Sequence, residues 1–205
     1  MHYSSDDPLV MTRIFEPEVN MVVWQQEQQA SAYVHEILQL PWKLNLKASF
    51  PLQDLDKSLN ESLPDLTAKD GFIDQLVELG EMFACLFDQE RIGWRMQVLD
   101  QPMCPRFHVD RVPCRLAATF AGPGTEWLTH EQVDRSFLGP RHPEEAALEG
   151  RLYQQDTQIQ RLQTGEVGLL KGSLWEGNED RGLVHRSPGV PAGQKRLLLT
   201  LDLAS

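Results

Sequence analysis

Short apolar runs separated by turn residues fill the chain from residue 91 onward, and this pattern limits the fold more than any other feature. In IGWRMQVLD (92–100) the large apolar and the polar side chains largely alternate, as in a strand with one buried face. Similar short runs, bounded by Gly or Pro, are RLAATFAG (115–122), GTEWL (124–128), EVGLLKGSLW (166–175), GLVHRS (182–187) and KRLLLTLDL (195–203). They predict an all-β sandwich or barrel of about seven or eight short strands.

The first part of the chain has helical periodicity instead. EQQASAYVHEILQL (27–40) places its apolar residues near helical spacing, and LPDLTAKDGFIDQLVELGEMFACLFDQE (63–90) has a wide apolar face that suits packing against a sheet. Asp70 is the expected N-cap of the second helix. We therefore expect residues 1–91 to form a mainly helical layer on a β core formed by residues 92–203.

One polar segment interrupts the predicted strands. PEEAALEGRLYQQDTQIQRLQTG (143–165) predicts a helical insertion that starts near Pro143 and ends at Gly165. A chain of 205 residues is the usual size of one domain with some elaboration. The expected class is thus α+β, in a single domain that spans residues 1–205.

Charge and cysteine content exclude several classes of protein. A net charge of −11 argues against broad binding to nucleic acids, which requires many cations. The sequence has no apolar run near the roughly 20 residues of a membrane span, and its first residues do not resemble an export signal. Three cysteines do not favour a disulfide framework, so the expected location is cytoplasmic.

The stretch CPRFHVDRVPC (104–114) concentrates residues that carry chemistry. In a strand, His108 and Asp110 would point the same way and could converge on one ion. A second His-x-acid match, at residues 142–144, lies in a proline-bearing loop and is attributed to chance. His185 follows on a later predicted strand, and Arg196 opens the last one.

This order of residues resembles the iron(II)- and 2-oxoglutarate-dependent oxygenases, over about residues 92–203. The resemblance implies a double-stranded β-helix (jelly roll, cupin-like) with N-terminal helices packed on one sheet. It also implies that His108, Asp110 and His185 bind Fe(II) as a 2-His-1-carboxylate triad, and that Arg196 holds the distal carboxylate of 2-oxoglutarate. The expected reaction is oxidation of an unactivated C–H bond in a small molecule. The whole chain is also similar to an uncharacterised bacterial family known only as a domain of unknown function.

The chain departs from the oxygenase pattern at Leu198. Many members have Ser or Thr two residues after the arginine, and its hydroxyl contacts the keto acid. Thr200 and Lys171 are two candidates to replace this hydroxyl, and the sequence does not choose between them.

Two other interpretations of this region stay open. Cys104, His108 and Cys114 could bind zinc in a protein of metal homeostasis or delivery, if bends at the nearby prolines bring them together. In an extended strand Cys104 and His108 would be about 13 Å apart, which is too far for one ion. Alternatively, His185 is a core histidine bonded to a backbone carbonyl, and Arg196 a surface cation.

The arginines near the predicted site suggest an anionic substrate. Arg106 and Arg111, with Arg186 beside the distal histidine, would make the mouth of the site cationic in an acidic protein. The alternative is that they pair with the excess of acidic residues.

Overall fold

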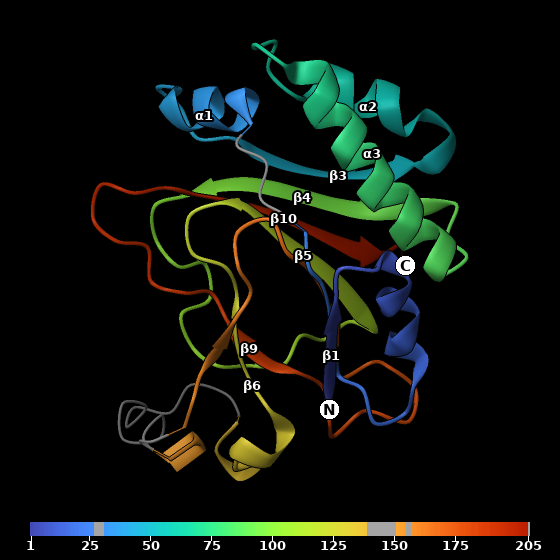
Figure 1. Cartoon of the computed structure of the whole chain (residues 1–205), viewed down its shortest axis with the longest axis vertical. Helices are drawn as coiled ribbons and strands as arrows, with labels where there is room; N and C mark the ends of the chain where they lie inside the picture. The colour runs from blue at the N-terminus through green and yellow to red at the C-terminus, as the bar shows by residue number, and fades with distance from the viewer. Residues whose placement is uncertain (27–30, 139–150, 155–156, 205) are drawn as a thin grey trace.

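A seven-stranded sheet forms the centre of the computed structural model, which describes residues 1–26, 31–138, 151–154 and 157–204. Its strand order is β1-β2-β8-β5-β10-β4-β3, with all neighbours antiparallel except β1 and β2 (Figure 1). The strands are β1 (His2–Ser5), β2 (Met21–Trp24), β3 (Asn45–Pro51), β4 (Arg91–Leu99), β5 (Cys114–Ala121), β8 (Val167–Lys171) and β10 (Arg196–Leu203). A smaller sheet has the order β7-β6-β9 and consists of β6 (Glu126–Leu128), β7 (Gln160–Arg161) and β9 (Val184–Arg186). The class is therefore mixed α+β.

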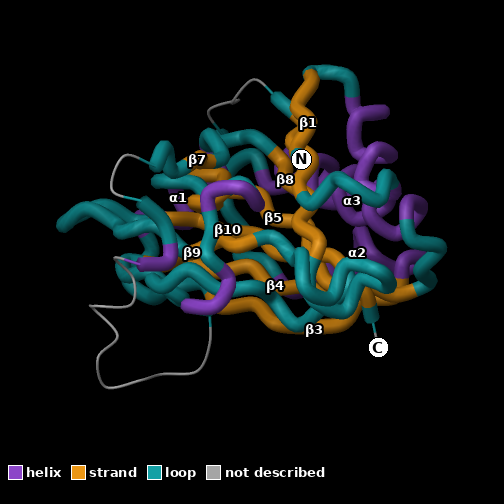
Figure 2. The backbone as a smooth tube through the Cα atoms, turned by 90° about the horizontal axis from the view of Figure 1, so that it is seen from below, coloured by secondary structure: helices purple, strands orange, loops and turns teal. Residues whose placement is uncertain are grey.

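Helices cover one face of the large sheet. The α-helices are α1 (Ala32–Gln39), α2 (Leu55–Ser62) and α3 (Lys69–Leu86), and the 3-10 helices are η1 (Pro8–Phe15), η2 (Leu52–Asp54), η3 (His130–Gln132) and η4 (Arg135–Phe137). Figure 1 shows α2 and α3 beside β3 and β4, and in Figure 2 the strands β3, β4, β10 and β5 follow one another. Within the described part of the chain, no helix is long and apolar enough to cross a membrane.

The two faces of the large sheet have different roles. Trp94 and Met96 of β4, with Leu199 of β10, are buried against α3 side chains such as Phe83 in the main core. Because side chains alternate along a strand, the residues between them point to the other face. On β10 these are Arg196, Leu198 and Thr200, and they line a cavity.

The strands predicted after residue 91 are confirmed, but the N-terminal part is less helical than expected. It supplies β1, β2 and β3 to the large sheet. Met21–Trp24 is buried at all four positions, so this run lacks the alternation that marks a half-exposed strand. Its place in the sheet comes from pairing with β8, which is distant in sequence.

The predicted helices need correction at their ends. The structure describes the 27–40 helix as α1, capped by the hydroxyl of Ser31, and residues 27–30 lie outside the described part. The helix predicted over 63–90 spans Lys69–Leu86, with Ala68 in the left-handed region (φ 57°) at its N-cap. Asp70, predicted as the N-cap, lies in its first turn.

Only part of the predicted insertion can be compared. Residues 143–150 and 155–156 lie outside the described part of the chain, whereas Gln160 and Arg161 form β7. Residues 151 and 152 are helical, as predicted, whereas the prediction is wrong at Gln160–Arg161, because the helix was expected to continue to Gly165. Arg161 pairs across the strands with Glu126, and this ion pair favours β pairing over a solvated helix.

Candidate metal centre

His108, Asp110 and His185 lie together, with one potential ligand atom from each within 4.8 Å of the others. His108 and His185 form an antiparallel bridge in which each backbone N–H donates to the other's carbonyl at 3.0 Å. Such a pair is directly opposed across the two segments, and the ring centroids are 4.6 Å apart. Residues 77 positions apart in the sequence thus become neighbours through one strand-like contact.

Both imidazole rings present the same nitrogen to the centre of the cluster. Nδ1 of His108 donates to the Arg106 carbonyl at 2.8 Å, and Nδ1 of His185 to the Leu183 carbonyl at 3.1 Å. A carbonyl only accepts, so each Nδ1 carries a hydrogen and is bonded away from the cluster, which leaves Nε2 as the nitrogen that faces it. Each Nε2 faces Asp110, at 3.5 Å for His108 and 3.2 Å for His185. In metal sites, a hydrogen bond such as these two from Nδ1 to a backbone carbonyl orients the histidine so that its other nitrogen can bind the ion.

Asp110 is held as a carboxylate by its surroundings. Burial alone would raise its pKa, but hydrogen bonds from His108 and His185 and the nearby Arg115 charge hold the pKa well below its ordinary value. Arg115 donates from Nη1 to Asp110 Oδ2 at 2.6 Å. Its Nε and Nη2 bond both oxygens of Asp202, at 2.7 and 2.8 Å. Arg115 therefore links Asp110 to β10.

The segment that carries Asp110 is fixed against the end of β8. The Ser173 N–H donates to the Asp110 carbonyl and the Gly172 N–H to the Pro113 carbonyl, both at 2.9 Å. A Cβ at Gly172 would lie 2.0 Å from the Val112 carbonyl oxygen, so only glycine allows this approach. The backbone thus sets the position of Asp110 before any side-chain contact.

The three residues line a cavity of about 260 Å³. The other residues that line it are Arg95, Met103, Cys104, Arg115, Ala117, Thr125, Leu170, Arg186, Ser187, Arg196, Leu198 and Thr200. The cavity lies on the face of the large sheet opposite the main core, because β4, β5 and β10 contribute alternate side chains to it. Its size suits a small molecule or two.

Arg196 is a buried cation in this cavity. It is 1 % exposed and donates to three hydroxyl groups, those of Ser187 at 3.0 Å, Thr125 at 2.9 Å and Thr119 at 3.2 Å. Within the described residues no carboxylate bonds to it, and its Nε has no partner. Burial lowers its pKa to about 10. A guanidinium placed this way is suited to bind an anion that enters the cavity.

Thr200 and Lys171, the two candidates to replace the hydroxyl that is missing at position 198, differ in their position relative to the cavity. Thr200 lines the cavity, and its Oγ1 has no partner in the described part of the chain. Lys171 is not among the residues that line the cavity. It donates to the Glu16 carbonyl at 2.8 Å and lies over the Trp175 ring. Leu198 itself lines the cavity.

The two cysteines of the zinc interpretation are not brought together with the histidines. Cys104 is exposed and lines the cavity, but it does not belong to the ligand cluster. Cys114 is fully buried in the main core, on the opposite face of the sheet, where burial raises the pKa of its thiol.

The predicted substrate arginines also differ in their position. Arg186 lines the cavity, donates to Glu126 at 2.7 Å and stacks over Phe107 at 4.3 Å. Arg106 is not among the lining residues. Arg95 does line the cavity, but sequence reasoning placed it only on the polar side of a strand. The alternation of side chains along β4 indicates the face on which Arg95 lies. Its place beside the cluster depends on the pairing of β4 with β10, which the sequence does not show.

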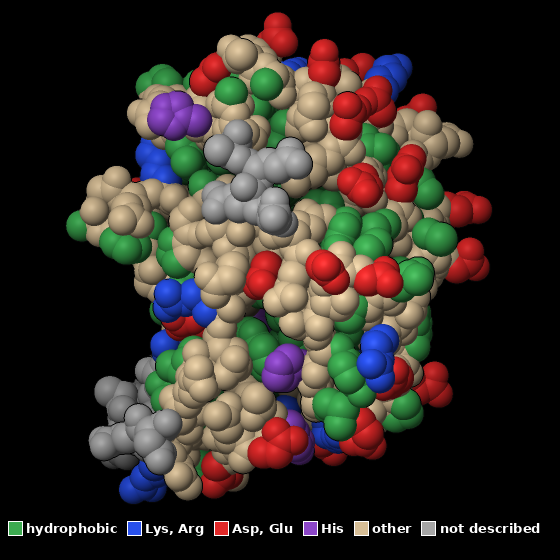
Figure 3. Space-filling view, viewed as in Figure 1, with side chains coloured by type: hydrophobic (Ala, Val, Ile, Leu, Met, Phe, Trp, Pro, Cys, Tyr) green, Lys and Arg blue, Asp and Glu red, His purple; other side chains and the backbone are tan. Residues whose placement is uncertain are grey.

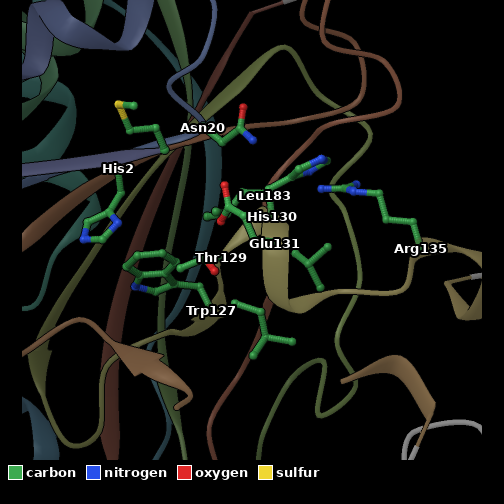
Figure 4. Close-up of a pocket in the computed structure, with 11 residues that line it drawn as sticks. His2, Asn20, Trp127, Thr129, His130, Glu131, Arg135 and Leu183 are labelled. Carbon is green, nitrogen blue, oxygen red and sulfur yellow. The ribbon is translucent and has the colours of Figure 1, made fainter. Parts of the chain in front are cut away.

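A second cavity of about 50 Å³ lies apart from this cluster (Figure 4). His2 stacks edge-on against Trp127 there, and Asn20, His130 and Arg135 each leave one buried polar atom without a partner among the described residues. A cavity of this volume holds one or two ordered waters, which usually satisfy such atoms.

Comparisons with known proteins agree with this architecture. The family described as "Protein of unknown function (DUF1826)" matches residues 5–202. The chain belongs to this family. No curated protein matches the chain.

Solved structures show the fold that the chain shares. One is the dioxygenase for auxin oxidation 1 from Arabidopsis thaliana as a 2-oxoglutarate complex, with a TM-score of 0.56 and 9% identity over 100% of this chain and 92% of that one. Another is the rice dioxygenase for auxin oxidation, with a TM-score of 0.50 and 12% identity over 96% and 77% of the two chains. At such identities the likeness shows a common fold.

Proposed function

We propose that this DUF1826 protein is a non-haem Fe(II)- and 2-oxoglutarate-dependent oxygenase that acts on a small anionic substrate. Its two sheets would then be those of a double-stranded β-helix, with the helices packed on the larger sheet. The shared fold with two plant dioxygenases, one of them a 2-oxoglutarate complex by name, supports this reading.

One observation carries the proposal: a cluster of potential metal ligands lines the same cavity as a buried arginine that bonds no carboxylate of the described chain. His108, Asp110 and His185 offer two imidazoles and one carboxylate, the set that holds non-haem Fe(II) and leaves coordination positions open. Arg196 offers a guanidinium fork that fits the distal carboxylate of 2-oxoglutarate. Neither feature alone points to this cosubstrate.

The residues of the chain have separable tasks in such a reaction. Fe(II) and 2-oxoglutarate, once bound, would supply oxygen activation and the two electrons that decarboxylation releases. The two histidines orient their Nε2 atoms toward the ion, and Arg115 keeps Asp110 ionised and in place. Arg196 and its hydroxyl partners hold the far end of the keto acid. Met103, Leu170 and Leu198 give the cavity part of its apolar lining.

The first experiment is anaerobic titration of Fe(II)-loaded protein with 2-oxoglutarate. Chelation of iron by the keto acid should produce a weak visible charge-transfer band. His185→Ala should lose both metal and band while staying folded. His35→Ala, which changes an exposed histidine of α1, should retain both. Absence of the band in wild type loaded with iron would contradict the proposal.

The competing function is a zinc-binding protein of metal homeostasis or delivery that uses the same cavity. The exposed Cys104, which lines the cavity, is the observation in its favour. If the metal content of purified protein falls in Cys104→Ser but not in Asp110→Asn, the zinc function is supported instead.

A further inference from the structure

We propose that Arg95 binds the acidic group of the primary substrate, a small organic anion with an apolar body. This inference rests on the proposed function, because it assigns Arg196 to 2-oxoglutarate and leaves Arg95 for the second molecule in the cavity.

The position of Arg95 on β4 turns it into the cavity. Its neighbours Trp94 and Met96 belong to the main core, whereas Arg95 lines the opposite face. In the sheet, Arg95 lies directly across from Thr200 of β10, and Thr200 from Ala117 of β5; both residues also line the cavity. No residue in the described part of the chain forms a hydrogen bond or an ion pair with Arg95.

A second cation stands beside Arg95. Lys47 of β3 is its cross-strand partner, so the two side chains leave the sheet on the same face. Lys47 is exposed, and among the described residues no acid pairs with it. Like charges directly opposite each other destabilise a sheet. An anion bound between them would remove this repulsion.

The charges around the cavity leave room for such an anion. Among the described residues, four guanidinium groups line it, those of Arg95, Arg115, Arg186 and Arg196, together with the carboxylate of Asp110. Ion pairs with these arginines add Asp202 and Glu126, and Glu126 also pairs with Arg161, so five guanidinium groups face three carboxylates. A divalent ion and a dianionic keto acid would cancel each other, so the positive excess persists in the loaded site. The visible outer surface, in contrast, carries many acidic side chains (Figure 3). The cavity therefore attracts anions more strongly than the rest of the protein does.

The register of the sheet separates Arg95 from Arg196. Arg95 pairs with Thr200, four residues from Arg196 on β10, which is about 13 Å of strand. Arg115, which holds Asp110, pairs with Asp202, only two positions beyond Thr200. Arg95 is thus displaced from the keto-acid end toward the metal ligands. Leu198 lies between Arg196 and Thr200 on β10, and both Leu198 and Leu170 of β8 add apolar lining to the cavity.

The test uses full-length protein loaded with Mn(II) and 2-oxoglutarate, and calorimetric titration of phenylacetate, phenylphosphonate and the neutral phenylacetamide. At least one of the two anions should bind more tightly than the amide. Arg95→Gln should weaken anion binding by about 10- to 100-fold and leave amide binding unchanged. Arg95→Lys should recover part of the affinity. Arg91→Gln, which removes an exposed charge from the same strand, is the matched control and should bind as wild type does.

The outcomes separate this inference from the proposed function. If Arg95→Gln loses 2-oxoglutarate, or if the anions displace 2-oxoglutarate from wild type, Arg95 belongs to the cosubstrate site and the inference fails. It also fails if neither anion binds better than the amide. If wild type binds Mn(II) but not 2-oxoglutarate, the proposed function fails. In that case the same anion titration, repeated on Mn(II)-loaded wild type and Arg95→Gln without 2-oxoglutarate, still tests whether Arg95 binds the anion.

Discussion

Arg196 places a positive charge in the interior next to three hydroxyl groups and no carboxylate of the described chain. A buried charge without an ionic partner lowers the stability of the protein unless it binds a ligand. Burial also lowers its pKa to about 10, which reflects this unfavourable desolvation. Such a residue is expected to be kept for binding.

The first prediction separates binding from stability at this residue. Arg196→Met should weaken 2-oxoglutarate binding by roughly 30- to 1,000-fold, since a charge-assisted bidentate pair is lost. The free energy of unfolding without ligand should stay equal or rise, by up to about 1–4 kcal/mol. Urea unfolding and calorimetry measure the two effects, with Arg196→Lys as the charge-preserving variant. A variant that is less stable yet binds 2-oxoglutarate normally would show a purely structural role.

The second prediction concerns Arg115, which donates a hydrogen bond to the proposed metal ligand Asp110 and is not itself a proposed ligand. Arg115→Lys keeps the charge but cannot bridge Asp110 and Asp202 with one planar fork. Metal affinity should fall by about 10- to 100-fold, the usual effect of losing such a partner. Competition with a metal chelator measures it, and circular dichroism checks the fold. Arg13→Lys, in an exposed pair with Glu16, should leave metal affinity unchanged.

At this scale the sequence reveals some site residues and hides others. The resemblance to the oxygenases, through the order of His108, Asp110, His185 and Arg196 along predicted strands, named residues that the structure places in one cavity. Arg115, Asp202 and Arg95 reach the site through the pairing of β5, β10 and β4, which joins distant segments. No local pattern marks them, because a charged residue on the polar side of a strand is ordinary.

Among the elements, the small sheet carries the distal histidine and depends on one acid. Glu126 of β6 lies directly across from Arg161 of β7 and from Arg186 of β9, and it pairs with both. Burial would raise the pKa of Glu126, but the two arginines lower it below its ordinary value. His185 lies next to Arg186, so this ion-pair network supports the site from outside.

The third prediction follows from the direction of this shift. A lowered carboxyl pKa contributes stability that is present above the unfolded pKa, about 4.3, and is lost as pH falls through the folded value. Glu126→Gln should therefore lower the free energy of unfolding at pH 7, and its difference from wild type should shrink as pH falls below about 4. Urea unfolding across pH measures it. Glu16→Gln, in the exposed pair with Arg13, should show a much smaller difference at every pH.

The elements also show why the N-terminal strands were missed. The strands after residue 91 alternate or are bounded by turn residues, so their type could be predicted. Met21–Trp24 and Asn45–Pro51 lie between helical segments, and their strand pairing comes from β8 and β4. Tertiary contacts, and not local propensity, determine that these two segments form strands.

For the whole molecule, the large sheet divides stability and binding between its two faces. Consecutive residues of β10 show this: Leu199 belongs to the main core under the helices, and Leu198 lines the cavity. The fold can therefore keep a packed core on one side while the other side holds polar and charged residues such as Arg196 and Thr200. The exposed fractions of the two residues are similar, 0% for Leu199 and 5% for Leu198, so the face of the sheet on which each lies distinguishes their roles.

The last prediction tests this division with one substitution on each face. Leu199→Ala should lower the free energy of unfolding by about 2–5 kcal/mol, because it leaves a cavity in close-packed surroundings. Metal and 2-oxoglutarate affinity of the folded protein should stay at wild-type values. Leu198→Ala should lower stability less, by about 1–2 kcal/mol, because part of its surroundings is already open. It should change 2-oxoglutarate affinity, since the variant widens the cavity beside Arg196. Urea unfolding and calorimetry on the same two variants decide the matter. Equal effects of both leucines on binding would contradict the separation of the two faces.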